Sequence, residues 1–159
     1  MSYFPIFMDL SERTIVIAGG FKYAERRLRA LLPFAKRIIV ISDAFSESFS
    51  GLLESLSEDD RVIVRRRLYE SGDIDGAFLV FACTKDKDLN RRIMEECREK
   101  GILGNAIFDK EHSGFSFPGL VYRDPFVIGF AAGGEAHHLV GELRARTAEI
   151  AEELLERLK

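Results

Sequence analysis

The sequence predicts an α/β fold built on a parallel sheet, followed by an antiparallel strand pair and a final helix. Short apolar runs alternate with helical patterns up to about residue 107, which is typical of consecutive strand–helix–strand units. Beyond residue 112 the pattern changes to two β-prone aromatic segments with no helix between them. The last segment, about 135–158, carries apolar residues at helical spacing among many charges. We therefore divide the chain into residues 1–112 and residues 113–159.

Composition limits the classes of partner. The 159 residues, 47% of them hydrophobic, suit one domain with a small appendage. With 23 basic and 26 acidic residues and a net charge of −3, the chain has no electrostatic basis for binding nucleic acid or an anionic membrane. No segment is long and apolar enough to cross a bilayer, and the N-terminus lacks a secretory signal pattern. Cys83 and Cys97 stand apart in apolar patterns, which predicts buried thiols and a cytoplasmic location.

The first strand and helix organise the predicted sheet. Thr14–Ile17 has the β-branched, apolar pattern of a buried strand. Apolar residues at positions 24, 28, 31 and 32 then share one face of a helix, which Pro33 ends.

The turn between them contains Ala18, Gly19 and Gly20, with Phe21 and Lys22 next along the chain. Such a glycine turn brings backbone N–H groups at a helix N-terminus to the pyrophosphate of a dinucleotide, and Lys22 would attract a phosphate. If Gly19 is the first glycine of the dinucleotide motif, Phe21 stands where the second glycine belongs and Ala24 stands at the third position; if Ala18 and Gly20 are the pair, Ala24 comes one residue late. A plain strand-to-helix connection explains the same residues.

A carboxylate follows the second predicted strand. The strand covers Arg37–Ser42, and Asp43 comes directly after it. In a dinucleotide fold a carboxylate at this place binds the ribose hydroxyls and favours NAD over NADP. Two local alternatives fit equally: Asp43 caps the next helix, or Ser46 does so with Asp43 in the turn.

Three arginines end the third predicted strand. Val62–Val64 is the strand, and Arg65, Arg66 and Arg67 follow it. A row of arginines can steer an anionic substrate. We favour the interpretation that this is an edge strand whose solvated charges block sheet-to-sheet association.

The most apolar run of the chain predicts an interior strand. It covers Ala77–Cys83 and ends at Thr84, at the sheet edge where ligands of open α/β sheets bind, so we expect Thr84 to touch a cofactor. Asp86 or Asp88 caps the following helix. Ile102–Ile107 is the next strand.

The two ends of the chain are both predicted to be extended. Met1–Leu10 alternates apolar and other residues, which predicts a packed edge segment. His112–Arg123 and Phe126–Ala131 form the antiparallel pair, joined by a turn at Asp124-Pro125. Because an isolated aromatic pair exposes its rings to water, we expect a homodimer through residues 115–131.

Three segments carry a combined motif. They are Tyr3–Leu10; Asp75–Thr84 with Asp86 and Asn90; and Asn105 and Asp109 with Phe115–Pro118, Val121, Arg123, Pro125 and Gly133-Gly134. Their order and spacing over about residues 3–134 resemble the NAD-dependent precorrin-2 dehydrogenase family, the N-terminal module of siroheme synthases.

The resemblance implies a Rossmann-type domain that binds NAD, a homodimer with exchanged strands, and oxidation of precorrin-2 to sirohydrochlorin. It places the tetrapyrrole substrate in a cleft shared between subunits, with Asn105 and Arg123 as substrate-binding candidates. In the family an aspartate after the fifth strand is catalytic. Here Phe108 takes that place, and Asp109, one residue later, is the catalytic candidate. Asp109 also fits as a turn residue, and Arg123 as a dimer contact.

The sequence leaves two hypotheses about function. The first is an active dehydrogenase. The second, favoured by the displaced aspartate and the altered glycine motif, is a non-catalytic homologue that binds a tetrapyrrole or a partner enzyme of the pathway. His112, His137 and His138 are candidate metal or tetrapyrrole ligands. Because consecutive helical residues point about 100° apart, we expect no metal site and a solvated or interface role for these histidines.

Overall fold

The computed structural model describes residues 4–132 and 137–157 of the chain, with side chains of the last stretch described from residue 139 onward. It contains two compact units. One is formed by residues 8–115, and the other by residues 1–7 together with residues 116–159. No helix of the described residues combines the length and apolar character needed to cross a membrane.

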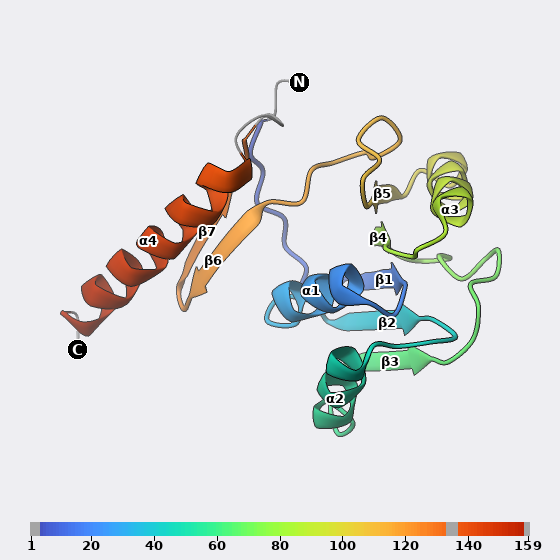
Figure 1. Cartoon of the computed structure of the whole chain (residues 1–159), viewed down its shortest axis with the longest axis horizontal. Coiled ribbons are helices and arrows are strands. Elements are labelled where there is room, and N and C mark those ends of the chain that lie inside the picture. Colours follow the sequence, from blue (N-terminus) through green and yellow to red (C-terminus); the bar gives the residue numbers. More distant parts are fainter. Residues whose placement is uncertain (1–3, 133–136, 158–159) are drawn as a thin grey trace. The chain divides into compact units, whose positions relative to one another are not determined.

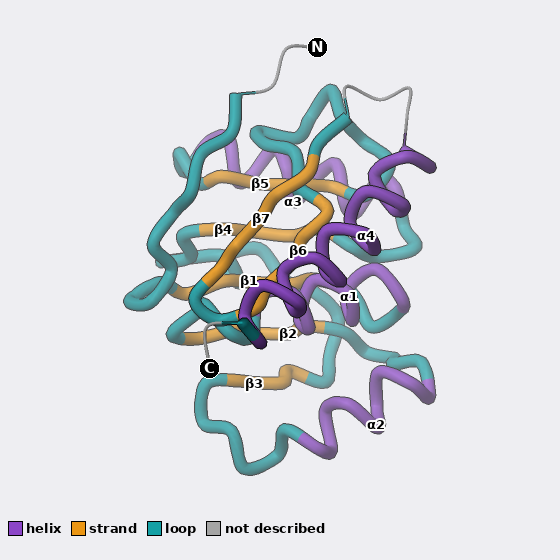
Figure 2. The backbone as a smooth tube through the Cα atoms, turned by 90° about the vertical axis from the view of Figure 1, so that its left-hand side faces the viewer, coloured by secondary structure: helices purple, strands orange, loops and turns teal. Residues whose placement is uncertain are grey.

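The larger unit is a five-stranded parallel sheet in the order β3-β2-β1-β4-β5 (Figure 1). The strands are β1 Thr14–Ala18, β2 Arg37–Ile41, β3 Val62–Arg65, β4 Leu79–Ala82 and β5 Leu103–Ala106. Figure 2 shows them side by side from β5 to β3. The chain winds outward from β1 to β3 and then returns to place β4 on the other side of β1. The predicted parallel α/β fold is confirmed, with its topological switch point between β1 and β4.

Three helices cover the sheet: α1 Lys22–Leu31, α2 Glu47–Ser55 and α3 Lys87–Glu99. Ile93, Met94 and Cys97 of α3 pack in one buried cluster with alternate strand residues such as Val80 and Ala82. Because strand–helix–strand connections are right-handed, α1 and α2 lie on the opposite face. Both cysteines are buried free thiols, as predicted.

Side-chain caps settle two local alternatives. The Ser46 hydroxyl accepts a hydrogen bond from the Phe49 N–H at 3.3 Å and caps α2. The Asp86 carboxylate accepts bonds from the N–H groups of Asp88 and Leu89, at 2.9 and 3.0 Å, and caps α3. Asp43 therefore has no capping role.

The smaller unit contains an antiparallel pair, β6 Gly119–Arg123 and β7 Phe126–Phe130, and the helix α4 His137–Glu156, which packs on β6. The predicted pair and final helix are confirmed, but the strand expected from residue 112 begins only at Gly119. The preceding residues are held along β5 instead. Gly114 donates its N–H to Gly104 O at 2.8 Å, and the Asn105 side-chain amide donates to Phe115 O at 2.9 Å.

The predicted packed edge segment at the N-terminus is wrong. Residues 4–10 form no strand, and Phe4, Ile6 and Phe7 are 84%, 73% and 73% exposed. A strand needs a ladder of backbone partners, and among the described residues of this stretch only Leu10 has any, because its carbonyl oxygen accepts hydrogen bonds from the N–H groups of Arg13 and Lys36, at 3.0 and 3.2 Å.

The interpretation of the arginine row as solvated charges is wrong for Arg65 and Arg67, although Arg66 is exposed and β3 is an edge strand as predicted. Arg65 and Arg67 bind the buried carboxylate of Asp73, at 2.7 and 2.5 Å, and Glu70 N–H donates to it at 2.9 Å. Burial by itself would raise the pKa of Asp73, but these hydrogen bonds outweigh it and hold the pKa below its usual value. Two of the three arginines therefore stabilise the loop after β3 and are not available to steer substrate.

Candidate functional site

A cavity of about 270 Å³ opens where β1, β2 and β4 end. It is lined by Gly19, Gly20, Phe21, Ile41, Ser42, Asp43, Leu68, Tyr69, Thr84, Lys85, Asp86 and Leu89. The ends of parallel strands beside a topological switch point are the usual binding site of open α/β sheets. The cavity thus brings together most of the residues that the sequence singled out for cofactor binding: Gly19, Gly20, Phe21, Asp43 and Thr84.

The glycine turn is required by close backbone packing. Gly19 has φ of +133°, and a Cβ atom there would lie 2.4 Å from the carbonyl oxygen of Cys83 at the end of β4. A Cβ at Gly20 would lie 1.8 Å from the carbonyl oxygen of Ala44. Gly20 O also accepts a hydrogen bond from Ser46 N at 2.8 Å. The two glycines therefore hold the ends of β2 and β4 against the start of α1.

The first turn of α1 suits an anion. Phe21 is its N-cap residue and makes no side-chain capping hydrogen bond. The N–H groups that open a helix have no intrahelical acceptor and carry a partial positive charge. The one acidic residue of this turn, Glu25, is bound by Arg29 and Ser48, at 2.8 and 3.0 Å. Ala18 is buried beneath the turn, and Lys22 begins the helix without lining the cavity.

Asp43 lies in the cavity wall at the end of β2. Because Ser46 caps α2, the Asp43 carboxylate is not used for capping, and it has no hydrogen-bond partner within the described residues. A carboxylate in this position can accept hydrogen bonds from a pair of ribose hydroxyls.

Thr84 lines the cavity too, but its hydroxyl is already engaged. It lies 2.7 Å from the side-chain oxygen of buried Asn90 and 2.9 Å from Asp86 O. Asn90 in turn donates to Thr84 O at 3.1 Å. The hydrogen bonds between Thr84 and Asn90 hold the backbone in one conformation where it leaves β4, and they thereby fix the direction of the residues after Thr84.

Asp109 lies in a tight loop after β5. Phe108 has φ of +60°, and Asp109 N–H donates a hydrogen bond back to Ala106 O at 3.4 Å, so the alternation of side chains along β5 is broken at this loop. The Asp109 carboxylate accepts a hydrogen bond from His112 Nδ1 at 2.8 Å, and this bond holds the pKa of Asp109 below its usual value. Asp109 is not among the residues that line the cavity at the glycine turn.

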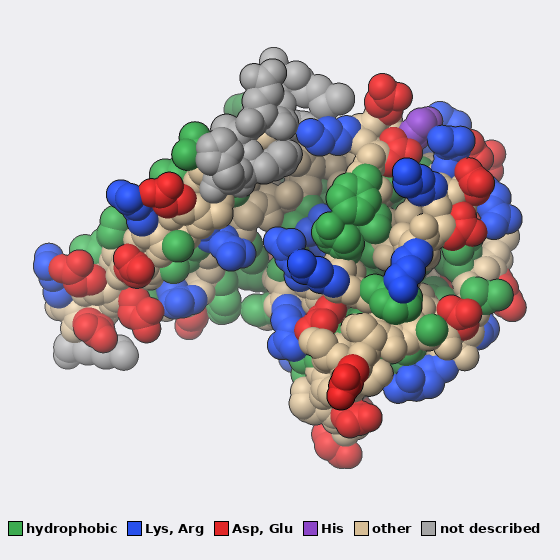
Figure 3. Space-filling view, in the orientation of Figure 1, with side chains coloured by type: hydrophobic (Ala, Val, Ile, Leu, Met, Phe, Trp, Pro, Cys, Tyr) green, Lys and Arg blue, Asp and Glu red, His purple; other side chains and the backbone are tan. Residues whose placement is uncertain are grey.

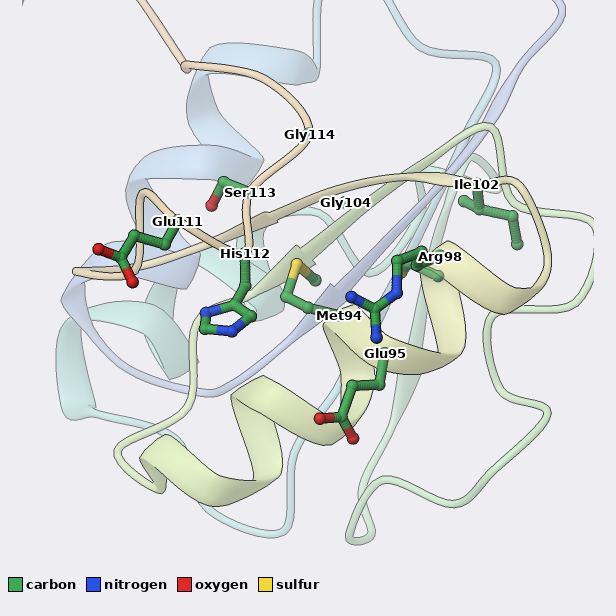
Figure 4. A pocket seen from close by; sticks show the side chains of 10 residues that line it. Met94, Glu95, Arg98, Ile102, Gly104, Glu111, His112, Ser113 and Gly114 are labelled. Carbon is green, nitrogen blue, oxygen red and sulfur yellow. The ribbon is translucent and has the colours of Figure 1, made fainter. Parts of the chain in front are cut away.

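His112 faces a second cavity, of about 320 Å³, beside α3 and β5 (Figure 4). Arg98, Glu95 and Glu111 supply its other charged walls. Phe108, by contrast, packs edge-on against Tyr23 in the first turn of α1, with ring centroids 5.0 Å apart. The loop after β5 therefore packs on α1 through Phe108 and lines the second cavity through His112.

The two substrate-binding candidates belong to different units. Asn105 on β5 is buried, and its side-chain oxygen has no hydrogen-bond partner within the described residues. Arg123 ends β6, where it lies 3.6 Å from the Glu152 carboxylate of α4. The side chains of His137 and His138 lie outside the described residues, which contain no group of three potential metal ligands.

Sequence reasoning missed Lys85, Leu68 and Tyr69 as cavity residues. Lys85 directly follows Thr84 at the end of β4, so its position was available as a signal. Leu68 and Tyr69 come from the irregular loop after β3, whose path no sequence pattern reveals.

Comparison with known proteins assigns the domain that contains this cavity to a family. Residues 6–119 match the model of NAD_binding_7, a family described as NAD(P)-binding. The chain belongs to this NAD(P)-binding family. The matched segment of the NAD(P)-binding domain includes all five parallel strands and every residue of the glycine-turn cavity.

Relatives of this NAD(P)-binding chain confirm the resemblance found in the sequence. Siroheme synthase 1 of Serratia proteamaculans is 31% identical over 92% of this chain, and siroheme synthase of Thioalkalivibrio sulfidiphilus is 34% identical over 92%. The chain spans 30% and 29% of these two relatives. Among solved structures, SirC, a precorrin-2 dehydrogenase, has the same fold, with a TM-score of 0.73 and 17% identity over 92% of this chain and 70% of SirC.

Proposed function

We propose that this chain is a cytoplasmic, NAD-dependent dehydrogenase that oxidises precorrin-2 to sirohydrochlorin. The observation that carries the proposal is the cavity in which the glycine turn, the uncapped start of α1 and the unpartnered Asp43 carboxylate converge. The names of the siroheme synthase relatives and of the SirC structure support the pathway.

The cavity residues fit the parts of a dinucleotide. N–H groups of the Gly20 turn and of the first turn of α1 would bind the diphosphate. Asp43 would accept hydrogen bonds from the adenosine ribose, and Leu68 and Tyr69 offer apolar surface to the adenine ring. When bound, the nicotinamide accepts a hydride from the substrate.

The oxidation also releases a proton, and Asp109 is the proposed acceptor. Like any aspartate with a pKa at or below the usual value, it is ionised at neutral pH and can accept a proton. Phe108 in the same loop packs against Tyr23, which supports a position of the loop near the start of α1. Asn105 and Arg123 remain proposed substrate contacts. The Arg123 guanidinium suits a carboxylate of the substrate, whereas the unpartnered Asn105 amide oxygen can only accept a hydrogen bond from a donor group.

Asp43→Ala is expected to weaken NAD binding about tenfold, because the ribose loses two hydrogen bonds to a charged acceptor. NADP binding should change little, since its 2′-phosphate gains nothing from a carboxylate. Calorimetric titration of both nucleotides measures the difference.

Asp60→Ala, at an exposed aspartate in the turn before β3, is the matched control and should bind NAD as the wild type does. Wild-type protein that binds neither nucleotide at millimolar concentration would contradict the cofactor assignment. Equal loss of NAD and NADP affinity in Asp43→Ala would contradict the role of Asp43 in selecting NAD.

We also propose a homodimer through residues 115–131. A two-stranded sheet is marginal by itself, and Phe126 of β7 is 44% exposed. Along α4, apolar and charged side chains are interspersed on the surface (Figure 3), and Leu139, Leu143, Ile150 and Leu154 are about half exposed. Sedimentation at micromolar concentration should give twice the 18.0 kDa mass of one chain, and a monomer would contradict the dimer.

A second candidate is a non-catalytic homologue that binds a tetrapyrrole. It is favoured by Phe108 at the family's catalytic position and by the His112 contact of Asp109. NADH formation from precorrin-2 and NAD separates the two candidates. Turnover supports the dehydrogenase, whereas binding of NAD and tetrapyrrole without turnover supports the second candidate.

A further inference from the structure

We propose that Lys85 binds the diphosphate of the dinucleotide and that Phe21 holds the lysine in place for this contact. The inference rests on the proposed function, since it names a binding residue of the same cavity. Its ligand class is a nucleoside diphosphate group.

The first observation is a direct contact between the two side chains. The Lys85 ammonium lies 3.5 Å from the centre of the Phe21 ring. Contacts of a cation with a ring face within about 6 Å are attractive. Both residues line the cavity at the glycine turn, Phe21 from the N-cap of α1 and Lys85 from the end of β4. The ring thus holds the ammonium beside the start of α1.

The second observation is the charge of the cavity wall. Lys85 is the one basic residue among the described residues that line it. Lys85 forms no ion pair within the described part of the chain. Its neighbour Asp86 uses its carboxylate to cap α3. The ammonium therefore adds its charge to the partial positive charge at the start of α1.

The third observation explains why a lysine is needed here. In the usual motif the second glycine lets the backbone come close to the pyrophosphate. With Gly19 as the first glycine of the motif, Phe21 occupies that place, and its ring would hold one of the two phosphates away from the turn. A lysine on a flexible four-carbon stem can reach that phosphate, while the N–H groups of the turn bind the other. The pair of Phe21 and Lys85 thus substitutes for a missing close contact.

The test compares ADP with adenosine, which differ only in the diphosphate. In calorimetric titrations Lys85→Ala should lower ADP affinity about tenfold and leave adenosine affinity unchanged, as expected for a charged hydrogen bond to phosphate. Raising the salt concentration should weaken ADP binding less in Lys85→Ala than in the wild type. Lys87→Ala, at the exposed first residue of α3, is the matched control and should bind ADP normally.

Phe21→Leu keeps an apolar side chain but removes the ring, and should lower ADP affinity about threefold, in line with an exposed cation–ring contact. Unchanged or increased ADP affinity in Lys85→Ala would overturn the inference, since the lysine would then contribute nothing to diphosphate binding or would weaken it. If Lys85→Ala binds NAD and ADP as the wild type does, only this inference fails. If the wild type binds neither NAD nor ADP, the proposed function itself fails.

Discussion

Gly20→Ala is expected to lower dinucleotide affinity on the order of 100-fold and to reduce the midpoint of thermal unfolding. The added Cβ would lie 1.8 Å from Ala44 O and 2.7 Å from the Ser42 hydroxyl, so the segment after β2 must move away. That segment carries Asp43, and a displacement of about 1 Å in a binding group can cost about 100-fold. Overpacking against backbone costs about 1–3 kcal/mol, which corresponds to roughly 3–10 °C in a chain of this size.

Gly51→Ala provides the matched control for Gly20→Ala. Gly51 lies inside α2, and no atom comes within 4 Å of a Cβ placed there. The substitution should therefore stabilise the protein by about 0.5–1 kcal/mol, because alanine favours the helix over glycine, and leave affinity unchanged. Thermal scans and NAD titrations of both variants test the pair. Normal NAD affinity in Gly20→Ala would show that the fit between the turn and the Asp43 segment is not needed for binding.

If the chain oxidises precorrin-2 as we propose, Asp109→Asn is expected to lower turnover by about 10²–10⁴-fold, the usual contribution of a general base. The amide keeps the shape of the side chain and can still accept a hydrogen bond from His112, but it cannot take up a proton. NAD affinity should stay the same, because Asp109 does not line the glycine-turn cavity. Turnover close to the wild-type value would remove Asp109 from the mechanism.

His112→Ala tests the same mechanism through its pH dependence. The hydrogen bond from His112 lowers the pKa of Asp109, so the wild-type carboxylate is ionised and active down to a pH below the usual aspartate pKa. Without His112 the pKa rises toward its usual value. The acidic limb of the kcat/KM profile should then move to higher pH, with little change at neutral pH. If the acidic limb of the profile does not move, the group that titrates there is not Asp109.

Local sequence patterns were sufficient for the regular elements. The β-branched run at Thr14–Ile17 and the apolar run at Ala77–Cys83 gave strands close to those observed, since a strand covered on both faces must be apolar throughout. The glycine turn and Asp43 were identified by their order after predicted strands. Parallel topology brings the carboxyl ends of strands to one edge, so order along the chain was enough to place these residues together.

Contacts between distant residues decided the rest. The arginines after β3 look like surface charges until Asp73 is brought beneath them, eight residues after Arg65. The strand predicted from residue 112 begins only at Gly119, because Gly114 is hydrogen-bonded to Gly104 along β5. The contact of Lys85 with Phe21 joins residues that are 64 positions apart in the sequence. Sequence periodicity is set by each residue's neighbours along the chain, whereas such pairings depend on where the loops turn, and only the tertiary structure contains that information.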